Sequence, residues 1–268
     1  MKRIQLFEFE DFNWFPETIR TSMTNLIVVL HKLLGTKNVL SGLITTIKSK
    51  HQFSQIIDLG SGSGGIMPDV IKNLNEQDLS QKLNIILTDL HPNPEVVKHI
   101  NSKHNNISYL ETSINATELN DLPVGLKTMI NSFHHMPPKE AKRILKSAQD
   151  NQQALLIYEI AENKIPTLLW WLLLPISLVI LVVMSLFMTP FVKPLTWKQL
   201  LFTYLIPIIP ICYAWDGQAS LVRMYTFKDI DYLLQDFKSD QYSWEMATAK
   251  KANGKNLGYY ILGLPNKE

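Results

Sequence analysis

The sequence predicts an α/β fold in which a doubly wound, mainly parallel sheet is closed by a terminal antiparallel β-hairpin. Three observations support this. Strand-like and helix-like segments alternate over residues 55–160. Two strand-like segments separated by the polar turn KKANGKN follow near residue 250. An apolar stretch, residues 164–213, interrupts this pattern and is interpreted as an inserted helical hairpin.

Two helices are predicted before the first strand. Apolar side chains recur at helical spacing over residues 17–34, and Gly35 is suitable for ending that helix. A second helix is predicted over residues 39–50, so that residues 1–50 form a helical cover. The start of the chain lacks the long apolar core of a secretory signal peptide.

The sheet domain is predicted from residues 51–163 and 214–268, on the two sides of the apolar insert. Its first part contains strands at residues 55–59, 84–88, 107–111, 126–131 and 154–160 and helices at residues 67–75, 95–103 and 139–148. Its second part contains a helix at residues 226–237 and strands at residues 242–248 and 259–264.

The segment IIDLGSGSGG, residues 56–65, is the most informative in the chain. A short β-branched strand runs into Asp58, and a helix follows a loop that contains Gly60, Gly62, Gly64 and Gly65. Because glycine has no Cβ and tolerates positive φ, such a loop brings backbone N–H groups close to a ligand. The same letters satisfy the dinucleotide-binding pattern G-x-G-x-x-G, and a plain glycine-containing turn is a third explanation.

The spacing Asp-x-Gly-x-Gly-x-Gly, from Asp58 to Gly64, resembles the first motif of class I S-adenosylmethionine-dependent methyltransferases. The resemblance covers roughly residues 54–160 and 216–264. The predicted strand order along the chain matches the Rossmann-like class I methyltransferase fold better than the symmetric dinucleotide-binding fold. The segments FEFEDFNWFP and WDGQASLVRMYT are also similar to parts of bacterial proteins described only as class I methyltransferases. The resemblance implies S-adenosylmethionine as cofactor and S-adenosylhomocysteine as product.

The same resemblance implies cofactor contacts at the carboxyl ends of the strands. Asp58 and the glycine loop would hold the methionine amine and carboxylate, and Asp89 the ribose hydroxyls, with Glu95 as the alternative acid. After the third strand the family often has an acid and an alanine, whereas this chain has Asn115 and Ala116; the amide oxygen can still accept from the adenine amino group. The expected contacts are Asp58, Gly60, Ser61, Gly62, Gly64, Asp89, Leu90, Asn115, Ala116 and Asn131.

The segment NSFHHMPP, residues 131–138, resembles the apolar–His–His stretch that many small-molecule methyltransferases of this class carry after the fourth strand. His134 and His135 are predicted as catalytic, because histidine titrates near neutrality and suits proton removal from a substrate hydroxyl. At least one of the two is expected only to cap or pack. Adjacent histidines are expected to point apart, and no further ligand lies at suitable spacing, so no metal site is predicted.

Residues on the substrate side are predicted before the first strand, after the fourth strand and after the insert. They are Trp14, Arg20, Phe133, Asp216 and Arg223. Arg20 lies in the helical cover and suits a carboxylate; the alternative is that this cover only packs its aromatic residues on the core. Asp216 and Arg223 follow the insert, where the chain returns toward the carboxyl edge of the sheet.

The apolar insert predicts an association with the bilayer through residues 165–213. The uncharged run at residues 165–192 exceeds the ~20 residues that cross a bilayer. The second run, residues 200–215, is short for a span and contains two prolines. Two full spans would place Lys193 and Lys198 on the far side of the membrane, against the positive-inside tendency. A hairpin in one leaflet is therefore preferred over two spans, and a buried helix pair or an oligomer interface is the remaining interpretation.

We therefore predict a membrane-associated methyltransferase, with its catalytic part in the cytoplasm, that methylates an oxygen or nitrogen of a small, lipophilic acceptor. The alternatives are a membrane-anchored protein methyltransferase, a catalytically silent cofactor-binding scaffold and an NAD-dependent reductase. The net charge of +2 does not indicate a nucleic-acid partner. The single cysteine, Cys212, excludes an internal disulfide. The sequence does not indicate an oligomeric state.

Overall fold

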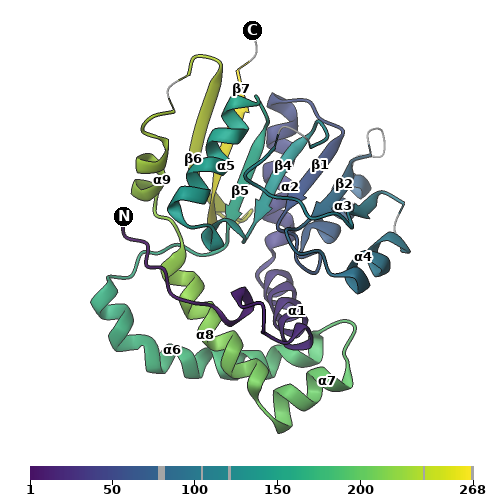
Figure 1. Ribbon diagram of the computed structural model, residues 1–268, viewed down its shortest axis with the longest axis vertical. Helices are drawn as coiled ribbons and strands as arrows, with labels where there is room; N and C mark the ends of the chain where they lie inside the picture. The colour runs from purple at the N-terminus through teal and green to yellow at the C-terminus, as the bar shows by residue number, and fades with distance from the viewer. Residues whose placement is uncertain (78–81, 104, 120–121, 238, 267–268) are drawn as a thin grey trace.

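The computed structural model describes residues 1–77, 82–103, 105–119, 122–237 and 239–266. Its strands are β1 (Gln55–Leu59), β2 (Asn84–Thr88), β3 (Ile107–Tyr109), β4 (Leu126–Ile130), β5 (Leu155–Glu159), β6 (Tyr242–Lys250) and β7 (Asn256–Pro265). They form one sheet in the order β3-β2-β1-β4-β5-β7-β6 (Figure 1). The strands β1 to β5 are parallel, and β7 pairs antiparallel with both β5 and β6. The predicted wound sheet with a terminal antiparallel hairpin is confirmed.

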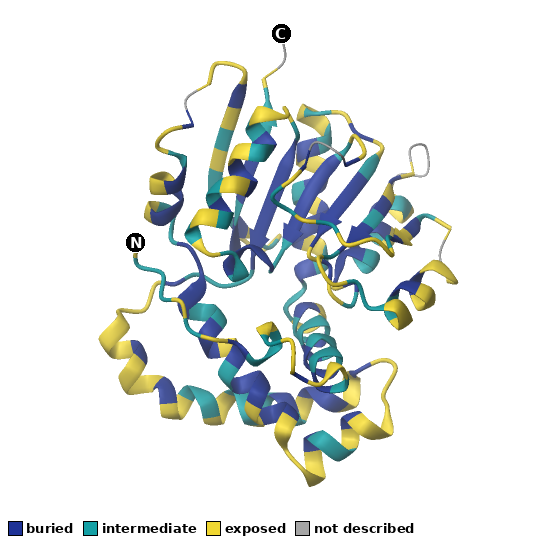
Figure 2. Cartoon of the chain, viewed as in Figure 1, coloured by how far each residue is buried: buried dark blue, intermediate teal, exposed yellow. Residues whose placement is uncertain are grey.

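Helices cover both faces of this sheet. They are α2 (Thr36–Lys50), α3 (Met67–Gln77) and α4 (Pro94–Asn101) on one face and α5 (Pro138–Asp150) and α9 (Phe227–Leu234) on the other. Successive strand residues point to opposite faces, so Ile56 packs with α2 and α3 whereas Ile57 packs with α5. The central strands β1, β4 and β5 are buried on both faces, whereas the edge strand β6 is partly exposed (Figure 2).

The helix α1 (Glu17–Leu34) crosses the carboxyl end of the sheet and not one of its faces (Figure 1). Gly35 ends it with a left-handed φ of 75°, as predicted, and donates its N–H to the carbonyls of His31 and Lys32. The next helix begins at once, at Thr36 and not at the predicted residue 39, and the two helix axes differ by 76°. α1 thereby forms a wall beside the strand ends.

The insert forms a layer on the far side of α1, along the lower edge of Figure 1. It consists of α6 (Thr167–Met188), η3 (Thr189–Phe191), α7 (Trp197–Leu200), η4 (Leu201–Leu205) and the beginning of α8 (Ile208–Arg223). α6 and α8 pack antiparallel, because Trp170 meets Gln218 while Met188 packs with Ile209. α8 continues through residue 213, so the boundary expected there falls inside a helix.

Among the described residues, one helix is long and apolar enough to cross a membrane: Thr167–Phe191, with a mean hydropathy of 2.6 in its most apolar window. Two bent pairs also meet these criteria of length and composition. They are α1 with α2, and Trp197–Leu205 with α8, which meet at 80°.

Candidate active site

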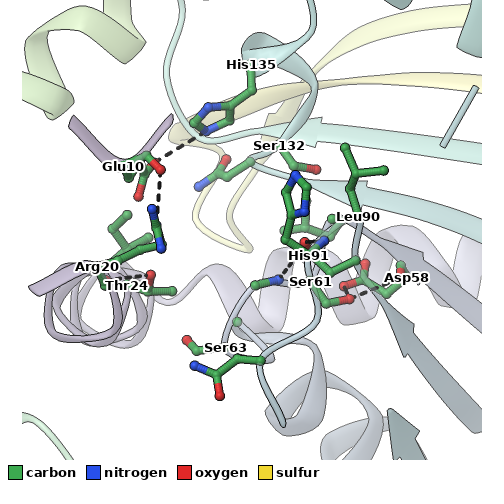
Figure 3. Close-up of a pocket in the computed structure, with 18 of the residues that line it drawn as sticks. Glu10, Arg20, Thr24, Asp58, Ser61, Ser63, Leu90, His91, Ser132 and His135 are labelled. Carbon is green, nitrogen blue, oxygen red and sulfur yellow. Dashed lines mark hydrogen bonds and ion pairs between the residues drawn. The ribbon is translucent and has the colours of Figure 1, made fainter. Parts of the chain in front are cut away.

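A cavity of about 680 Å³ lies at the carboxyl end of the parallel strands, between the glycine loop, α1 and the N-terminal segment (Figure 3). It is located where the strand order reverses between β1 and β4, which is the usual ligand site of a doubly wound sheet. Of the predicted cofactor contacts, those that line it are Asp58, Gly60, Ser61, Gly62, Asp89, Leu90, Asn115, Ala116 and Asn131.

Gly64 is the predicted cofactor residue that does not line the cavity. Its φ is 99°, and a Cβ there would lie 2.9 Å from Cδ1 of Ile100 on α4. Gly60 has a φ of 68°, and a Cβ there would lie 3.2 Å from Cβ of Ser132. The loop is therefore glycine-rich for two reasons: Gly64 lets it pack against α4, and Gly60 lets it pass the end of β4.

Asp58 is buried and joins the glycine loop to β4. The Thr128 hydroxyl donates to Oδ1 at 2.6 Å, and the Ser61 hydroxyl donates to Oδ2 at 2.7 Å. Burial raises the pKa of Asp58 to about 6, although these two hydrogen bonds act in the opposite direction. Asp58 thus holds the shape of the loop at the wall of the cavity.

Asp89 follows β2 directly and is fixed from both sides. Oδ2 accepts the Gly62 N–H at 2.9 Å, and Oδ1 accepts the His91 N–H at 2.8 Å. Each carboxylate oxygen keeps further lone pairs for hydroxyl groups of a ligand in the cavity. The alternative acid, Glu95, is exposed on the first turn of α4 and does not line the cavity.

Asn115 differs from the expected role. Its Oδ1 already accepts from the backbone N–H and the hydroxyl of Thr117, at 3.0 and 2.9 Å. The amide NH₂ is therefore the group that Asn115 offers to a ligand, and it suits a ring nitrogen better than an amino group. Leu90 and Ala116 supply apolar surface in the same part of the cavity.

The sequence did not single out His31, which lines the cavity from α1. Asn131 accepts the Ile160 N–H with Oδ1, so its Nδ2 donates to His31 Nε2 at 2.8 Å. The proton of the imidazole is therefore on Nδ1, which is buried without a partner among the described residues. Burial lowers the pKa of His31 to about 4. A signal was present, because Arg20, Thr24 and His31 share one helical face with the cavity.

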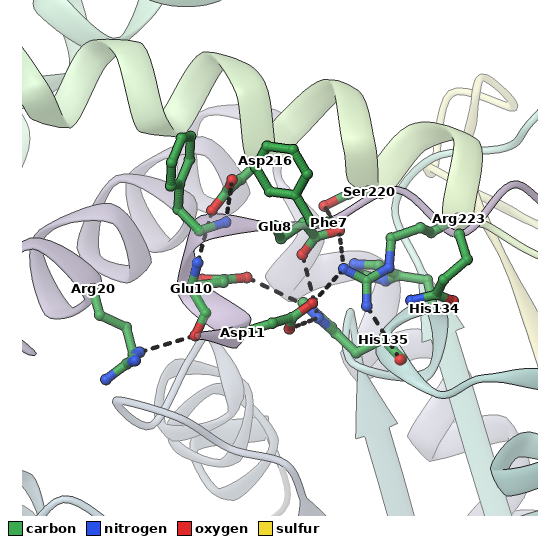
Figure 4. Close-up of polar contacts among 12 residues, drawn as sticks. Phe7, Glu8, Glu10, Asp11, Arg20, His134, His135, Asp216, Ser220 and Arg223 are labelled. Carbon is green, nitrogen blue, oxygen red and sulfur yellow. Dashed lines mark hydrogen bonds and ion pairs between the residues drawn. The ribbon is translucent and has the colours of Figure 1, made fainter. Parts of the chain in front are cut away.

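The N-terminal segment, residues 7–11, lies between α8 and the cavity (Figure 4). Asp216 on α8 accepts the N–H groups of Phe9 and Glu10, at 2.8 and 3.2 Å. Arg223, also on α8 and buried, binds Glu8 and Asp11. Asp216 and Arg223 were expected beside the substrate, but neither lines the cavity; they anchor the segment whose Glu10 and Asp11 do.

His135 is the predicted histidine that reaches the cavity. Its Nδ1 lies 3.2 Å from Asp11 Oδ1 and 3.3 Å from Glu8 Oε2, and its Nε2 lies 3.6 Å from Glu10 Oε1. Burial alone would lower the pKa of His135, but the three carboxylates outweigh it and raise the pKa to about 9. His135 is thus a cation at neutral pH, next to Glu10, whose pKa is raised by burial.

His134 is buried and faces Glu159 instead of the cavity. Its Nδ1 and its backbone N–H lie 2.9 Å from the two oxygens of that carboxylate. The expectation that the two rings point apart is wrong: they lie 4.3 Å apart, because the 3₁₀ turn η2 (Phe133–His135) turns both the same way. Together with Glu8 they present three ligand atoms within 4.8 Å of one another, but Glu159, Asp11 and Arg223 already engage these groups.

The remaining residues predicted on the substrate side lie in different places. Arg20 lines the cavity, where it pairs with Glu17 and donates to the carbonyls of Glu10 and Phe12. Trp14 is exposed and stacks on Phe12 outside the cavity. Phe133 is fully buried and packs on Tyr225 in the core, so it does not reach a substrate.

No protein-family model and no curated protein matches the chain. Solved structures match its fold. The plantazolicin methyltransferase BamL, in complex with a triazolic desmethylPZN analog and SAH, is 12% identical, with coverage of 93% of this chain and 98% of that chain and a TM-score of 0.52. The plantazolicin methyltransferase BpumL, in complex with SAH, is 9% identical, with coverage of 94% and 98% and a TM-score of 0.50.

Human N-acetylserotonin methyltransferase, in complex with SAM, is 14% identical, with a TM-score of 0.50 over 94% of this chain and 56% of that chain. Identities this low establish a shared fold. The strand order, the glycine loop at the switch point and these likenesses agree: the chain has the fold of the class I S-adenosylmethionine-dependent methyltransferases.

Proposed function

We propose that the chain is an S-adenosylmethionine-dependent methyltransferase that acts on an oxygen or nitrogen atom of a small, lipophilic acceptor. The observation that carries the proposal is the bond between Asp89 and the Gly62 N–H, 2.9 Å long, at the switch point of the sheet. This bond supports the proposal because it fixes an acid that would accept the ribose hydroxyls beside a loop whose N–H groups would face the methionine end.

The residues of the cavity fit this cofactor. Leu90 and Ala116 supply apolar surface for an adenine ring, and Asp89 two acceptor oxygens for the ribose. The buried, unpartnered Nδ1–H of His31 requires an acceptor, which the carboxylate of the methionine end offers. When bound, the cofactor supplies a methyl group that is already activated on a sulfonium, so that catalysis depends mainly on positioning.

The acceptor would lie where His135 and Glu10 meet. Asp11 and Glu8 hold Nδ1 of His135, which leaves Nε2 toward Glu10 and the cavity. Below about pH 9 the imidazolium donates a hydrogen bond to the acceptor oxygen or nitrogen and favours its deprotonation. The neighbouring Glu10 carboxylate takes the released proton. The predicted base is thus divided into a donor, His135, and a proton acceptor, Glu10.

The proposal includes membrane association through residues 165–213, with the catalytic part in the cytoplasm, where S-adenosylmethionine is available. It is supported by the 25-residue apolar helix and by the exposure of its side chains, such as Leu172 and Phe187. A bilayer beside the cavity concentrates lipophilic molecules, which supports an acceptor of that class.

Calorimetric titration of the full-length protein in detergent with S-adenosylhomocysteine, and separately with NADH, tests the proposal. We expect binding of S-adenosylhomocysteine alone. Asp89→Ala removes two charged acceptors, at ~1.5 kcal/mol or more each, so affinity should fall about 100-fold. Glu95→Ala, an exposed acid on the next helix, is the matched control and should bind like the wild type.

Binding of NADH in place of S-adenosylhomocysteine would contradict the proposal and favour a reductase. Binding of S-adenosylhomocysteine without transfer of a labelled methyl group to any component of a lipid extract would favour the silent scaffold. Transfer only to protein would favour the protein methyltransferase.

A further inference from the structure

The insert presents a continuous apolar surface that no described residue covers. We call it the apolar platform and define it by six strongly exposed side chains: Leu168, Leu172, Ile176, Phe187, Trp197 and Leu205. Each belongs to α6, α7 or η4. An exposed apolar surface of this extent requires a partner, and four observations identify that partner and its orientation.

First, one side of α6 packs on protein. Its buried side chains are Trp170 and Leu174 near its beginning and Ser185 and Met188 near its end, with the half-buried Leu178 and Met184 between them. The opposite stripe belongs to the platform (Figure 2). The helix is therefore divided lengthwise into a face that packs on protein and a face that does not.

Second, both ends of α6 contact residues that lie outside the insert. At its beginning, Trp170 and Leu174 pack with Val222 of α8 and with Ile4. At its end, Met188 packs with Met23 and Leu26 of α1. A helix that crosses a bilayer has one end ~30 Å away on the far side. α6 lies flat under the domain, across the lower edge of Figure 1.

Third, the second apolar run is not a straight span. Trp197–Leu205 and α8 meet at 80° next to Pro207, and the later part of α8 carries the buried Asp216 and Arg223. These two side chains bind the N-terminal segment beside the cavity. Moving α8 across a bilayer would break these contacts and place charged groups in lipid.

Fourth, the charges and the aromatic residues fit a lipid headgroup region. Residues 165–215 contain no Asp or Glu, and their only cations, Lys193 and Lys198, are exposed at the end of the platform. Trp171, Trp197 and Tyr204 are also exposed. Tryptophan, tyrosine and lysine side chains favour the boundary between headgroups and acyl chains.

We infer that the apolar platform lies in one leaflet of an anionic membrane, with α6 parallel to the membrane plane, and that neither apolar run crosses the bilayer. This inference rests on the proposed function, because it states how the membrane meets the cavity. α1 packs on α6 and α8 with one face and lines the cavity with the other. The helix α1 and the α6–α8 layer therefore separate the cavity from the acyl chains by about two helix diameters, ~20 Å, a distance that an acceptor from that leaflet has to cross.

The topology test uses the full chain with its only cysteine replaced, Cys212→Ala. Lys198→Cys probes the platform, and Lys255→Cys, exposed in the β6–β7 turn, probes the sheet domain. A membrane-impermeant maleimide is added to proteoliposomes before and after detergent. We expect both cysteines to be labelled to the same extent in intact vesicles. Labelling of Lys198→Cys only after detergent, while Lys255→Cys reacts in intact vesicles, would overturn the inference in favour of two spans.

Flotation with vesicles of phosphatidylcholine, with and without phosphatidylglycerol, tests the contact itself. Leu172→Glu combined with Phe187→Glu should weaken binding at least tenfold. Val124→Glu is the matched control, because Val124 is an apolar side chain, 87% exposed, in the loop before β4, and its replacement should change nothing. Lys193→Gln and Lys198→Gln should each weaken binding about fivefold, but only to vesicles that contain phosphatidylglycerol.

Calorimetry with S-adenosylhomocysteine on each variant separates this inference from the proposed function. If the unaltered chain does not bind S-adenosylhomocysteine, the proposed function is contradicted. The labelling result still decides the topology, because it does not depend on cofactor binding. The inference is overturned if the unaltered chain binds S-adenosylhomocysteine but does not float with vesicles, and if it forms a dimer that Leu172→Glu dissociates. These results would show that a second copy of the chain covers the platform.

Discussion

Asp58 and Asp89 show how two acids at one sheet edge acquire different tasks. Asp58 is buried, and hydroxyl groups of Thr128 and Ser61 engage both of its oxygens. Asp89 is half-buried and receives only backbone N–H groups, from Gly62 and His91. The first acid maintains the loop. The second lines the cavity with lone pairs that can still accept hydrogen bonds from a ligand.

Three of the histidines near the site, His31, His134 and His135, differ for the same kind of reason. Carboxylates surround His135 and keep it charged, whereas at His31 burial outweighs the charge of Glu159 and keeps the ring neutral. His134 pairs with one buried carboxylate, Glu159, away from the cavity. The environment of a histidine, more than its place in a motif, determines what it can do.

The titration of His135 is the first testable consequence. We expect an NMR midpoint of about 9 for its ring in protein with labelled histidine, assigned with His135→Gln. Asp11→Asn removes the negative charge beside Nδ1 and the hydrogen bond of that carboxylate to Nδ1. The midpoint should therefore shift toward about 6.5, the usual histidine value. Asp236→Asn, an exposed acid paired with Lys142, is the control and should leave the midpoint in place. A midpoint near neutrality in the wild type would contradict the assigned role.

His31 predicts a dependence of stability on pH. Its pKa in the folded protein is about 4, below the ~6.5 of an unfolded chain, so only the unfolded state takes up a proton between these values. The free energy of unfolding should therefore fall by about 3 kcal/mol from this residue as the pH falls from ~6.5 to ~4. Urea titrations of wild type and His31→Gln at both ends of this range measure the difference. If the free energy of unfolding depends on pH equally in the two proteins, His31 is not held in a neutral, buried state.

At the scale of elements, the connection between the sheet and the site depends on close backbone packing. Gly258 on β7 has a φ of 76°, and a Cβ there would overlap the carbonyl oxygen of Glu159, the residue that holds His134. Gly254, in the turn before β7, has a φ of 79° but nothing within 4 Å of such a Cβ. The two glycines thus share a backbone conformation and differ in the space around them.

This pair gives a matched test of the role of close packing. Gly254→Ala should cost about 1–2 kcal/mol, the strain of a left-handed residue. Gly258→Ala carries the same strain and in addition separates β7 from β5, so its cost should be at least twice as large. Thermal unfolding of both variants measures the difference. Equal destabilisation would mean that β7 does not approach β5 as described.

α8 is the element that connects the apolar layer to the cavity. Its first half packs with α6 and α1, and its second half anchors the N-terminal segment through Asp216 and Arg223. Asp11 in that segment binds His135 in turn. An element that packs on the apolar insert therefore also holds the segment that orients the proposed acceptor site.

At the scale of the whole molecule, the cavity is assembled from α1, the N-terminal segment and the strand ends, so a ligand there should stabilise the entire fold. S-adenosylhomocysteine at about 100 times its Kd adds ~2.7 kcal/mol, which raises the Tm of a chain of this size by about 5–10 °C. Differential scanning fluorimetry in detergent checks this. Asp89→Ala at the same concentration should show almost no shift, and an equal shift in that variant would contradict the assigned ribose contact.

Local patterns in the sequence were sufficient for the sheet and for one half of the site. The periodicities of β1, β2 and α1 depend on neighbouring residues, and parallel strands bring their carboxyl ends to one edge, so Asp58, Asp89 and Asn131 were expected together. The motif also pointed to the His–His turn. What it did not contain was the direction of each ring, which the η2 turn decides.

The other half of the site is determined only by the tertiary structure. Asp11 and His135 are 124 positions apart, and Asn131 and His31 are 100 apart, so no spacing in the chain links them. The position of the N-terminal segment between α8 and the cavity turned Asp216 and Arg223 from predicted substrate contacts into anchors. The sequence alone determined which segments form strands and that the insert is apolar, because these properties are local. Which polar groups meet, and with what charge, depends on packing between segments that are remote in the chain.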